Sequence, residues 1–176
     1  MVKSRNNFAL AAFLGCVFLA LFVGCQREDE GNEIGANLPE VACQPADVTA
    51  DPPFTVGSTR TAVPPETYLA DQIENYYGVS LVENRLANIS VFCDLFEMAD
   101  EAAAVEFLAR TCAVPQMEKA EPPVVGQEVC ALQSTGFRMV NFRQGTVVVS
   151  ILADSGGFSV DEWAVAVNGR LNQEGN

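Results

Sequence analysis

An uncharged apolar run covers residues 8–24, FALAAFLGCVFLALFVG, and ends directly at Cys25. Lys3 and Arg5 precede the run, and the polar, acidic stretch QREDEGNE follows it. A basic start followed by an apolar stretch is typical of a secretion signal, which takes no part in the fold of the mature protein. We therefore treat residues 1–24 as a signal peptide and expect the chain to be exported.

The residues Phe22-Val23-Gly24-Cys25 resemble the lipobox of a bacterial lipoprotein signal, in which small apolar residues precede an invariant cysteine. The resemblance implies that Cys25 is diacylated and becomes the new N-terminus. It also implies an extracytoplasmic protein anchored in a membrane. By the same analogy, Gln26 in place of an aspartate implies the outer membrane or the cell surface.

The apolar run allows three other interpretations. Cleavage before Cys16, after Phe13-Leu14-Gly15, would leave VFLALFVG as an apolar start to a soluble segment, which argues against it. An uncleaved anchor is an alternative, because residues 8–24 are at the short limit for spanning a bilayer. Ordinary secretion is another alternative.

Charge and composition exclude several function classes. After loss of Lys3 and Arg5 the chain carries eight basic and 23 acidic residues, a formal net charge of −15. Such a surface repels phosphate backbones, so we expect no nucleic-acid partner. The sequence contains no histidine, which excludes Ser-His-Asp catalysis, Cys-His catalysis and imidazole metal ligands.

The stretch after Cys25 reads as a tether. Residues 26–65 are polar, show no helical or strand period, and contain several prolines, including the pairs Pro52-Pro53 and Pro64-Pro65, so the tether is assigned to residues 25–64. We predict a lipidated N-terminus followed by a flexible tether, with an end-to-end distance of roughly 35 Å. Cys43 lies within it and is expected to fasten part of the tether to the domain.

Residues 65–176 are predicted to form one α+β domain with a mainly antiparallel sheet of about five strands, packed by about three helices. Asp100 is a predicted N-cap, Gln144-Gly145 a hairpin turn, and Ser159 with Glu162 a capping box. The expected elements are a helix over 65–78, two strands within 79–98, a helix over 99–112, strands over 127–133, 137–143 and 146–153, and a closing helix after Ser159.

A second resemblance concerns the domain itself. The segments YLADQIENYYG, ISVFCDLFEMADEAAAVEFLA, VVGQEVC and FRQGTVVVSI resemble, in their order, a family of uncharacterised exported bacterial domains. The resemblance covers residues 65–172 and implies one compact domain. It implies no activity and no site residue.

Four cysteines remain in the exported chain, Cys43, Cys93, Cys112 and Cys130, and their even number predicts two disulfides. Three pairings are possible. A strand leading away from Cys93 and a helix returning to Cys112 favour the pairs Cys93–Cys112 and Cys43–Cys130. Redox chemistry and a zinc site are disfavoured, because no C-x-x-C occurs.

Candidate sites are few. The loop DSGGFSVDEW carries Asp154, Asp161 and Glu162, which suit calcium by residue type, but their spacing matches no EF-hand loop. Phe158 in this loop could contact a partner or pack at the edge of the core. Tyr76-Tyr77 could stack on a flat ligand, although their spacing favours the core. We predict no catalytic, cofactor-binding or metal-binding residue, and no cofactor.

These observations favour a lipid-anchored extracytoplasmic protein without catalytic activity, which binds a small ligand or an envelope protein. Its contact with the membrane would run through lipidated Cys25. One alternative is a structural or assembly subunit of a cell-envelope complex. A less favoured alternative is a carboxylate-dependent hydrolase such as a glycosidase, which needs two converging acids.

Overall fold

The computed structural model describes residues 37–50, 53–83, 89–155 and 157–174. The signal segment and Cys25 lie outside these residues. The chain from Gly35 to Asn176 forms one compact unit. No helix in the described ranges is long and apolar enough to cross a bilayer.

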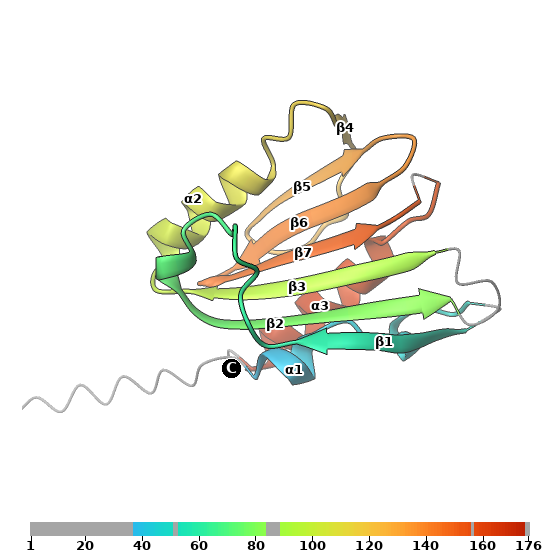
Figure 1. Cartoon of the computed structure of the whole chain (residues 1–176), viewed down its shortest axis with the longest axis horizontal. Coiled ribbons are helices and arrows are strands. Elements are labelled where there is room, and N and C mark those ends of the chain that lie inside the picture. Colours follow the sequence, from blue (N-terminus) through green and yellow to red (C-terminus); the bar gives the residue numbers. More distant parts are fainter. Residues whose placement is uncertain (1–36, 51–52, 84–88, 156, 175–176) are drawn as a thin grey trace, which may run out of the picture. The chain divides into compact units, whose positions relative to one another are not determined.

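A single antiparallel sheet of seven strands forms the centre of the unit, in the order β1-β2-β3-β7-β6-β5-β4 (Figure 1). The long strands β2 and β3 and the apolar strand β7 lie side by side in its middle. The strands are β1 (Phe54–Arg60), β2 (Ile73–Glu83), β3 (Ser90–Met98), β4 (Glu118–Ala120), β5 (Glu128–Gln133), β6 (Arg138–Gln144) and β7 (Val147–Ala153).

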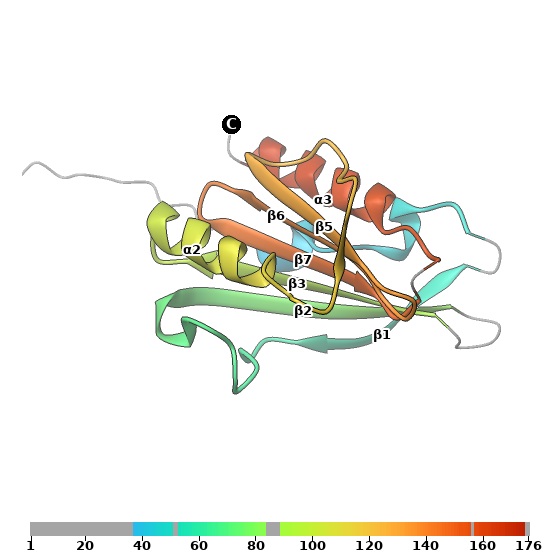
Figure 2. The same cartoon turned by 90° about the horizontal axis from the view of Figure 1, so that it is seen from above.

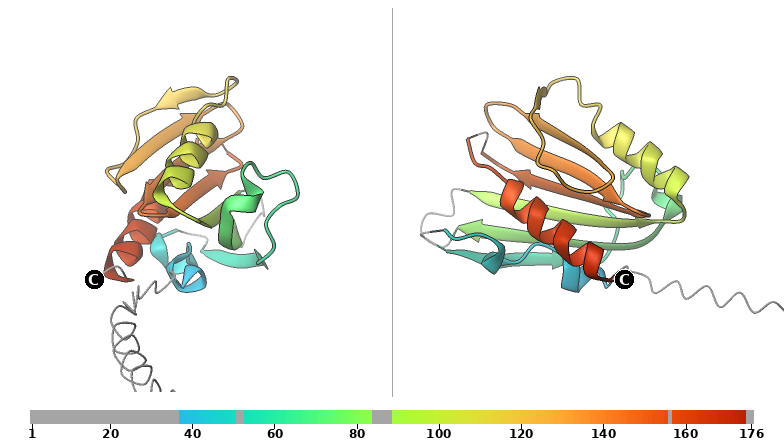
Figure 3. Two further views of the ribbon diagram at one scale, coloured as in Figure 1. Left: turned by 90° about the vertical axis from the view of Figure 1, so that its left-hand side faces the viewer. Right: turned by 180° about the vertical axis from the view of Figure 1, so that it is seen from behind.

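Helices cover both faces of the sheet (Figures 2 and 3). The helix α2 (Glu101–Thr111) packs on one face, here called the α2 face. The helices α3 (Asp161–Glu174) and α1 (Leu38–Val41) pack on the other, the α3 face. Because strand side chains alternate between faces, β3 contributes to two separate cores. Its residues Val91, Cys93 and Leu95 lie in the α3-face core, and Phe96 and Met98 lie in the α2-face core.

Local sequence explains the elements that were predicted correctly. The Asp100 carboxylate accepts a hydrogen bond from the Ala103 amide at 2.7 Å, which confirms the N-cap of α2. Gly145 has φ of 59° at the β6–β7 turn, as a tight hairpin requires. The α+β class, the single antiparallel sheet, and the strands β5, β6 and β7 are likewise confirmed.

The predicted helix over residues 65–78 is wrong. Only a short 3-10 helix, η2 (Ala70–Gln72), forms there, and β2 begins at Ile73. Leu69 adopts a left-handed conformation with φ of 52°, which a continuous α-helix does not allow. Aromatic and β-branched residues suit a strand, and pairing of residues 73–77 with β3 outweighs the weak helical spacing, whereas β1 pairs with β2 only from Gly78 onward. With β1 and β4 added, the sheet has seven strands rather than about five.

The predicted tether is also wrong for residues 38–50 and 54–60. Residues 37–50, called the N-terminal strap below, contain α1 and the 3-10 helix η1 (Pro45–Asp47), and β1 follows. Leu38 and Val41 are 0% and 1% exposed, so they belong to the α3-face core. A proline-rich segment without a period therefore folds here because its few apolar residues complete a core built by distant strands.

Three kinds of contact fasten the N-terminal strap. Cys43 forms a disulfide with Cys93 on β3. The guanidinium of Arg170 on α3 binds both carboxylate oxygens of Asp47 at 2.7 Å and donates to the carbonyl of Ala42 at 2.9 Å. The Trp163 indole donates to the carbonyl of Gln44 at 3.1 Å. The strap is thus joined to both the sheet and α3.

The predicted disulfide pairing is wrong, although all four cysteines are paired. The bonds join Cys43 to Cys93 and Cys112 to Cys130. Cys93 points to the α3 face, whereas Cys112 ends α2 on the opposite face, where Cys130 of β5 also lies. The prediction compared the length of the strand after Cys93 with that of the helix before Cys112. It did not take account of the face of the sheet on which each cysteine lies. The Cys43–Cys93 disulfide therefore fastens the strap on the α3 face, and the Cys112–Cys130 disulfide fastens the end of α2 on the α2 face.

Removing the contacts of the Arg170 guanidinium with Asp47 and Ala42, here called the Arg170 clamp, tests how the strap is fastened. Arg170→Met would leave the Asp47 carboxylate, whose side chain is only 6% exposed, without its cation. We expect a loss of about 2–4 kcal/mol in the free energy of unfolding, measured by urea denaturation. Arg110→Gln, which removes an exposed guanidinium stacked on Tyr68, is the control and should cost at most about 1 kcal/mol. Equal losses in the two variants would contradict the clamp.

The two disulfides should differ in their access to reductant. Cys43 and Cys93 are buried, whereas Cys112 and Cys130 are half-buried. Thiol–disulfide exchange requires access of a thiolate to sulfur. Brief treatment of the native chain with dithiothreitol, then alkylation and peptide mass spectrometry, should label Cys112 and Cys130 first. Labelling of all four at one rate would contradict the arrangement.

Candidate functional site

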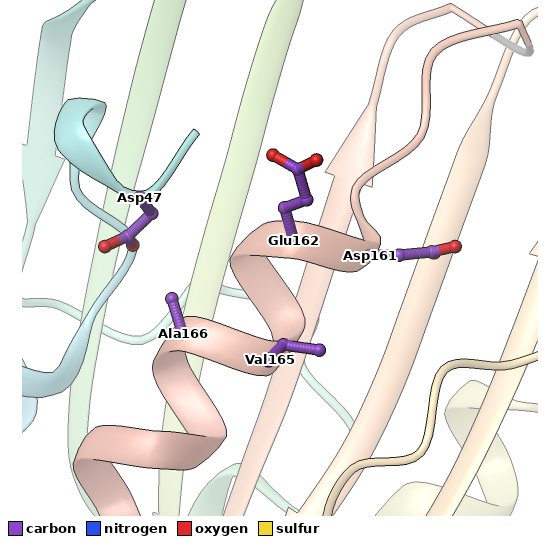
Figure 4. Close-up of a pocket in the computed structure, with 5 residues that line it drawn as sticks. All are labelled: Asp47, Asp161, Glu162, Val165 and Ala166. Atoms are coloured by element: carbon purple, nitrogen blue, oxygen red, sulfur yellow. The ribbon is translucent and has the colours of Figure 1, made fainter. Parts of the chain in front are cut away.

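A surface hollow lies between the N-terminal strap and the first half of α3 (Figure 4). Two shallow depressions of about 410 and 240 Å³ lie here, each with Glu162 in its lining, and we call the pair the α3 hollow. These volumes approach those of small-ligand sites. The lining residues are Asp47, Val48, Thr49, Ala50, Phe158, Ser159, Asp161, Glu162, Trp163, Val165 and Ala166.

Three carboxylates border the hollow, and two of them are already paired. Asp47 is bound by Arg170, and it also accepts from the Gln44 amide at 2.8 Å. Asp161 points away from Asp47 and pairs with Arg138 at 3.1 Å (Figure 4). Glu162 is exposed and has no hydrogen-bond or ion-pair partner among the described residues. The hollow therefore carries one free negative charge.

The rest of the lining is mainly apolar. The Phe158 and Trp163 rings have centroids 5.8 Å apart, and Phe54 packs edge-on against Trp163 at 5.1 Å. Of these rings only Phe158 is partly exposed, because Trp163 and Phe54 are buried behind it and the Trp163 indole is hydrogen-bonded to the strap. On the outer wall, Val165 is 54% exposed. This combination can bind a ligand, and no nucleophile with an activating base accompanies it in the described lining.

A cluster of three hydrogen-bonded side chains, called the polar group below, lies on the α2 face across β1, β2 and β3. Tyr76 donates to the Asp94 carboxylate at 2.5 Å, and Arg60 binds the same oxygen at 2.7 Å. Gly78 lies beneath them, where a Cβ atom would come within 2.5 Å of that oxygen. Burial, then the hydrogen bond to Asp94, raise the pKa of Tyr76 well above its usual range. The group joins three strands and has its one carboxylate neutralised by Arg60.

The acids of the loop DSGGFSVDEW do not converge. Asp154 accepts from the Ser90 amide at 2.6 Å, Asp161 faces Arg138, and Glu162 faces the α3 hollow. Within the described ranges, no three His, Cys, Asp or Glu side chains are grouped to hold a metal ion. Ser159 accepts a hydrogen bond from the Asp161 amide at 3.2 Å, not from the Glu162 amide, so the predicted capping box of Ser159 with Glu162 is wrong.

The aromatic candidates lie within or beside the cores. Tyr76 is buried on the α2 face, and Tyr77 is half-buried against the α3-face core. Phe158 is half-buried and forms part of the hollow. Cys25, the predicted lipidation site, lies outside the described residues.

Sequence reasoning missed the strap side of the hollow, because residues 44–50 were assigned to a tether. One signal was present: Val165 falls off the buried stripe of α3, which indicates an apolar residue facing outward. No family model matches the chain, and no curated protein or solved structure is significantly similar to it.

The polar group on the α2 face is expected to stabilise the fold less at alkaline pH than at neutral pH. Because the folded-state pKa of Tyr76 is raised, its stabilising contribution is present below about pH 10 and is lost as pH rises beyond that value. Tyr76→Phe should lower the free energy of unfolding by about 1 kcal/mol at pH 7. The difference in free energy of unfolding between wild type and Tyr76→Phe, measured by urea denaturation, should narrow between about pH 10 and 12. A constant difference would contradict the raised pKa.

Proposed function

We propose that this chain is a lipid-anchored extracytoplasmic protein whose domain binds a partner without catalysing a reaction. The observation that carries the proposal is the N-terminal strap, which is fastened to the core and also forms one wall of the α3 hollow. The segment that would lead to the anchor joins the strap at residue 37, and residues 47–50 of the same strap line the candidate binding site. Two disulfides suit an oxidising compartment outside the cytoplasm.

The strap shortens the proposed connection to the membrane. If Cys25 carries the lipid, only residues 26–36 separate it from the strap. At about 3.3–3.6 Å per residue, this segment spans at most about 40 Å. A domain on such a connection would stay close to the bilayer, within reach of envelope proteins.

Binding fits the charges of the hollow better than hydrolysis does. A carboxylate-dependent glycosidase uses one acid as proton donor and a second as base or nucleophile, on either side of the bond that breaks. In the α3 hollow, Asp47 and Asp161 are held by Arg170 and Arg138, so Glu162 is the one carboxylate available to a ligand. An assembly role in an envelope complex would use the same surface, and exposed Val165 is compatible with it.

The anchor is tested by substituting its cysteine. Cys25→Ala should abolish lipid modification, measured by mass spectrometry of the mature N-terminus and by metabolic labelling with palmitate. Wild-type protein should begin at a lipidated Cys25 and fractionate with the outer membrane or the cell surface. Cys16→Ala is the matched control and should be processed like wild type. An intact Met1 in the wild-type protein would overturn the lipid anchor.

A further inference from the structure

We propose that the Cys112–Cys130 disulfide is a thiol–disulfide exchange site, at which an external dithiol is oxidised while these two cysteines are reduced. The proposal goes beyond the binding role, because it concerns the α2 face and not the α3 hollow. The juxtaposition that carries it is a partly exposed disulfide beside a fully buried amide, Asn141, whose Nδ2 atom donates to Cys130 Sγ at 3.7 Å.

The two disulfides of the described chain differ in access. Cys43 and Cys93 are 4% and 0% exposed, whereas Cys112 and Cys130 are both partly exposed. A sulfur of the buried pair also accepts a hydrogen bond, from the Cys43 amide to Cys93 Sγ at 3.3 Å. Exchange requires a thiolate to reach a sulfur atom. Burial therefore excludes the Cys43–Cys93 pair, and Cys112–Cys130 is the pair that a dithiol can approach.

Asn141 is an unusual residue for its position in the sheet. It lies on β6 opposite Cys130 of β5, and it is the one fully buried polar side chain among the described residues. Its Oδ1 atom has no hydrogen-bond partner within the described chain. Donation from Nδ2 to a neutral sulfur offsets little of the cost of burying this amide. Donation to a thiolate at Cys130 would be a stronger, charge-assisted hydrogen bond.

The surroundings of Cys112 disfavour a thiolate at this residue. Cys112 is the C-cap of α2, at the negative end of the helix dipole. The basic residue of the last turn, Arg110, stacks on the Tyr68 ring and does not form an ion pair at Cys112. A negative charge on the Cys112 sulfur would therefore be less stable than one on a sulfur that accepts from an amide.

The surroundings of Cys130 favour a thiolate. The Asn141 amide lies beside its sulfur. The charged neighbours on the same face of the sheet, Glu128 and Arg143, are paired with each other at 2.7 Å, so that their charges offset one another. Because exchange is faster when the departing sulfur is a better-stabilised thiolate, Cys130 is the leaving sulfur and Cys112 the sulfur that is attacked.

The reaction is a two-electron exchange. A thiolate of the dithiol attacks Cys112 Sγ, the S–S bond breaks, and its electron pair leaves on Cys130, where the Asn141 amide stabilises it. The second thiolate of the dithiol attacks the mixed disulfide and releases Cys112. Two protons pass from the dithiol to the two cysteines through the solvent, and the dithiol becomes a disulfide. Reduction frees the end of α2 from β5.

The sulfur that is attacked can be identified by trapping. The full chain in phosphatidylcholine nanodiscs, with free thiols blocked by N-ethylmaleimide, is treated briefly with 2-mercaptoethanol, quenched with iodoacetamide and digested for mass spectrometry. We expect mercaptoethanol on Cys112 and carbamidomethyl on Cys130 in about tenfold excess over the reverse product. Equal amounts of the two products, or earlier reaction at Cys43 and Cys93, would overturn the assignment.

Two substitutions of nearly equal shape test Asn141. Asn141→Val removes the donor, whereas Asn141→Thr keeps a hydroxyl donor in its place. Asn141→Val should slow reduction of Cys112–Cys130 by dithiothreitol about tenfold and abolish the preference for adducts at Cys112. Asn141→Thr should stay within about threefold of wild type. Ser150→Ala, which removes the polar side chain opposite Asn141 on β7, is the control and should leave the rate unchanged.

A general loosening of the fold would give a different result. If Asn141→Val merely destabilised the domain, reduction would become faster and the preference for adducts at Cys112 would persist. That outcome, or equal rates in Asn141→Val and Asn141→Thr, would overturn the role of Asn141. If Asn141→Val does not fold, the adduct ratio of the wild-type protein decides alone. None of these outcomes bears on the lipid anchor or on binding at the α3 hollow.

Discussion

The disulfide between Cys43 and Cys93 is the constraint on which the rest of the structure depends. It joins residues 50 apart in sequence and ties the N-terminal strap to a strand in the middle of the sheet. In the chain-entropy description, closing such a loop contributes about 4 kcal/mol. Once the strap is held there, Leu38 and Val41 complete the α3-face core, and Arg170 can reach the strap's backbone and carboxylate. The α3 hollow exists only because the strap forms its second wall.

Elements with strong local signals could be predicted from sequence, and those that depend on distant pairing could not. The cap at Asp100, the turn at Gly145 and the apolar β7 run are local, and the structure confirms them. The helix expected over residues 65–78 failed because pairing with β3 decides the conformation from Ile73 onward. The strap was missed because its apolar residues are too sparse to show a period.

The cysteines and the candidate site show the same limit. An even count of cysteines correctly indicated two disulfides, but the pairing depends on which face of the sheet α2 covers, and Cys93 lies on the opposite one. The alternation of apolar residues along β3 already indicated two buried faces, without saying which helix covers which. The sequence indicated Glu162 as a capping residue and a calcium candidate, and its place in a hollow depends on the folded strap. The anchor at Cys25 remains a proposal from the signal alone.

Amide hydrogen exchange of the strap, followed by mass spectrometry on the native chain, tests most directly whether this segment belongs to the domain. The Val41 and Ala42 amides are hydrogen-bonded to the carbonyls of Asn37 and Leu38, at 3.2 and 3.0 Å, in a buried setting. We expect the strap peptides to exchange orders of magnitude more slowly than an unstructured chain, and to lose protection together with β3 when the disulfides are reduced. Exchange at the rate of an unstructured peptide in the oxidised protein would contradict the fastened strap, and with it the hollow that the strap forms.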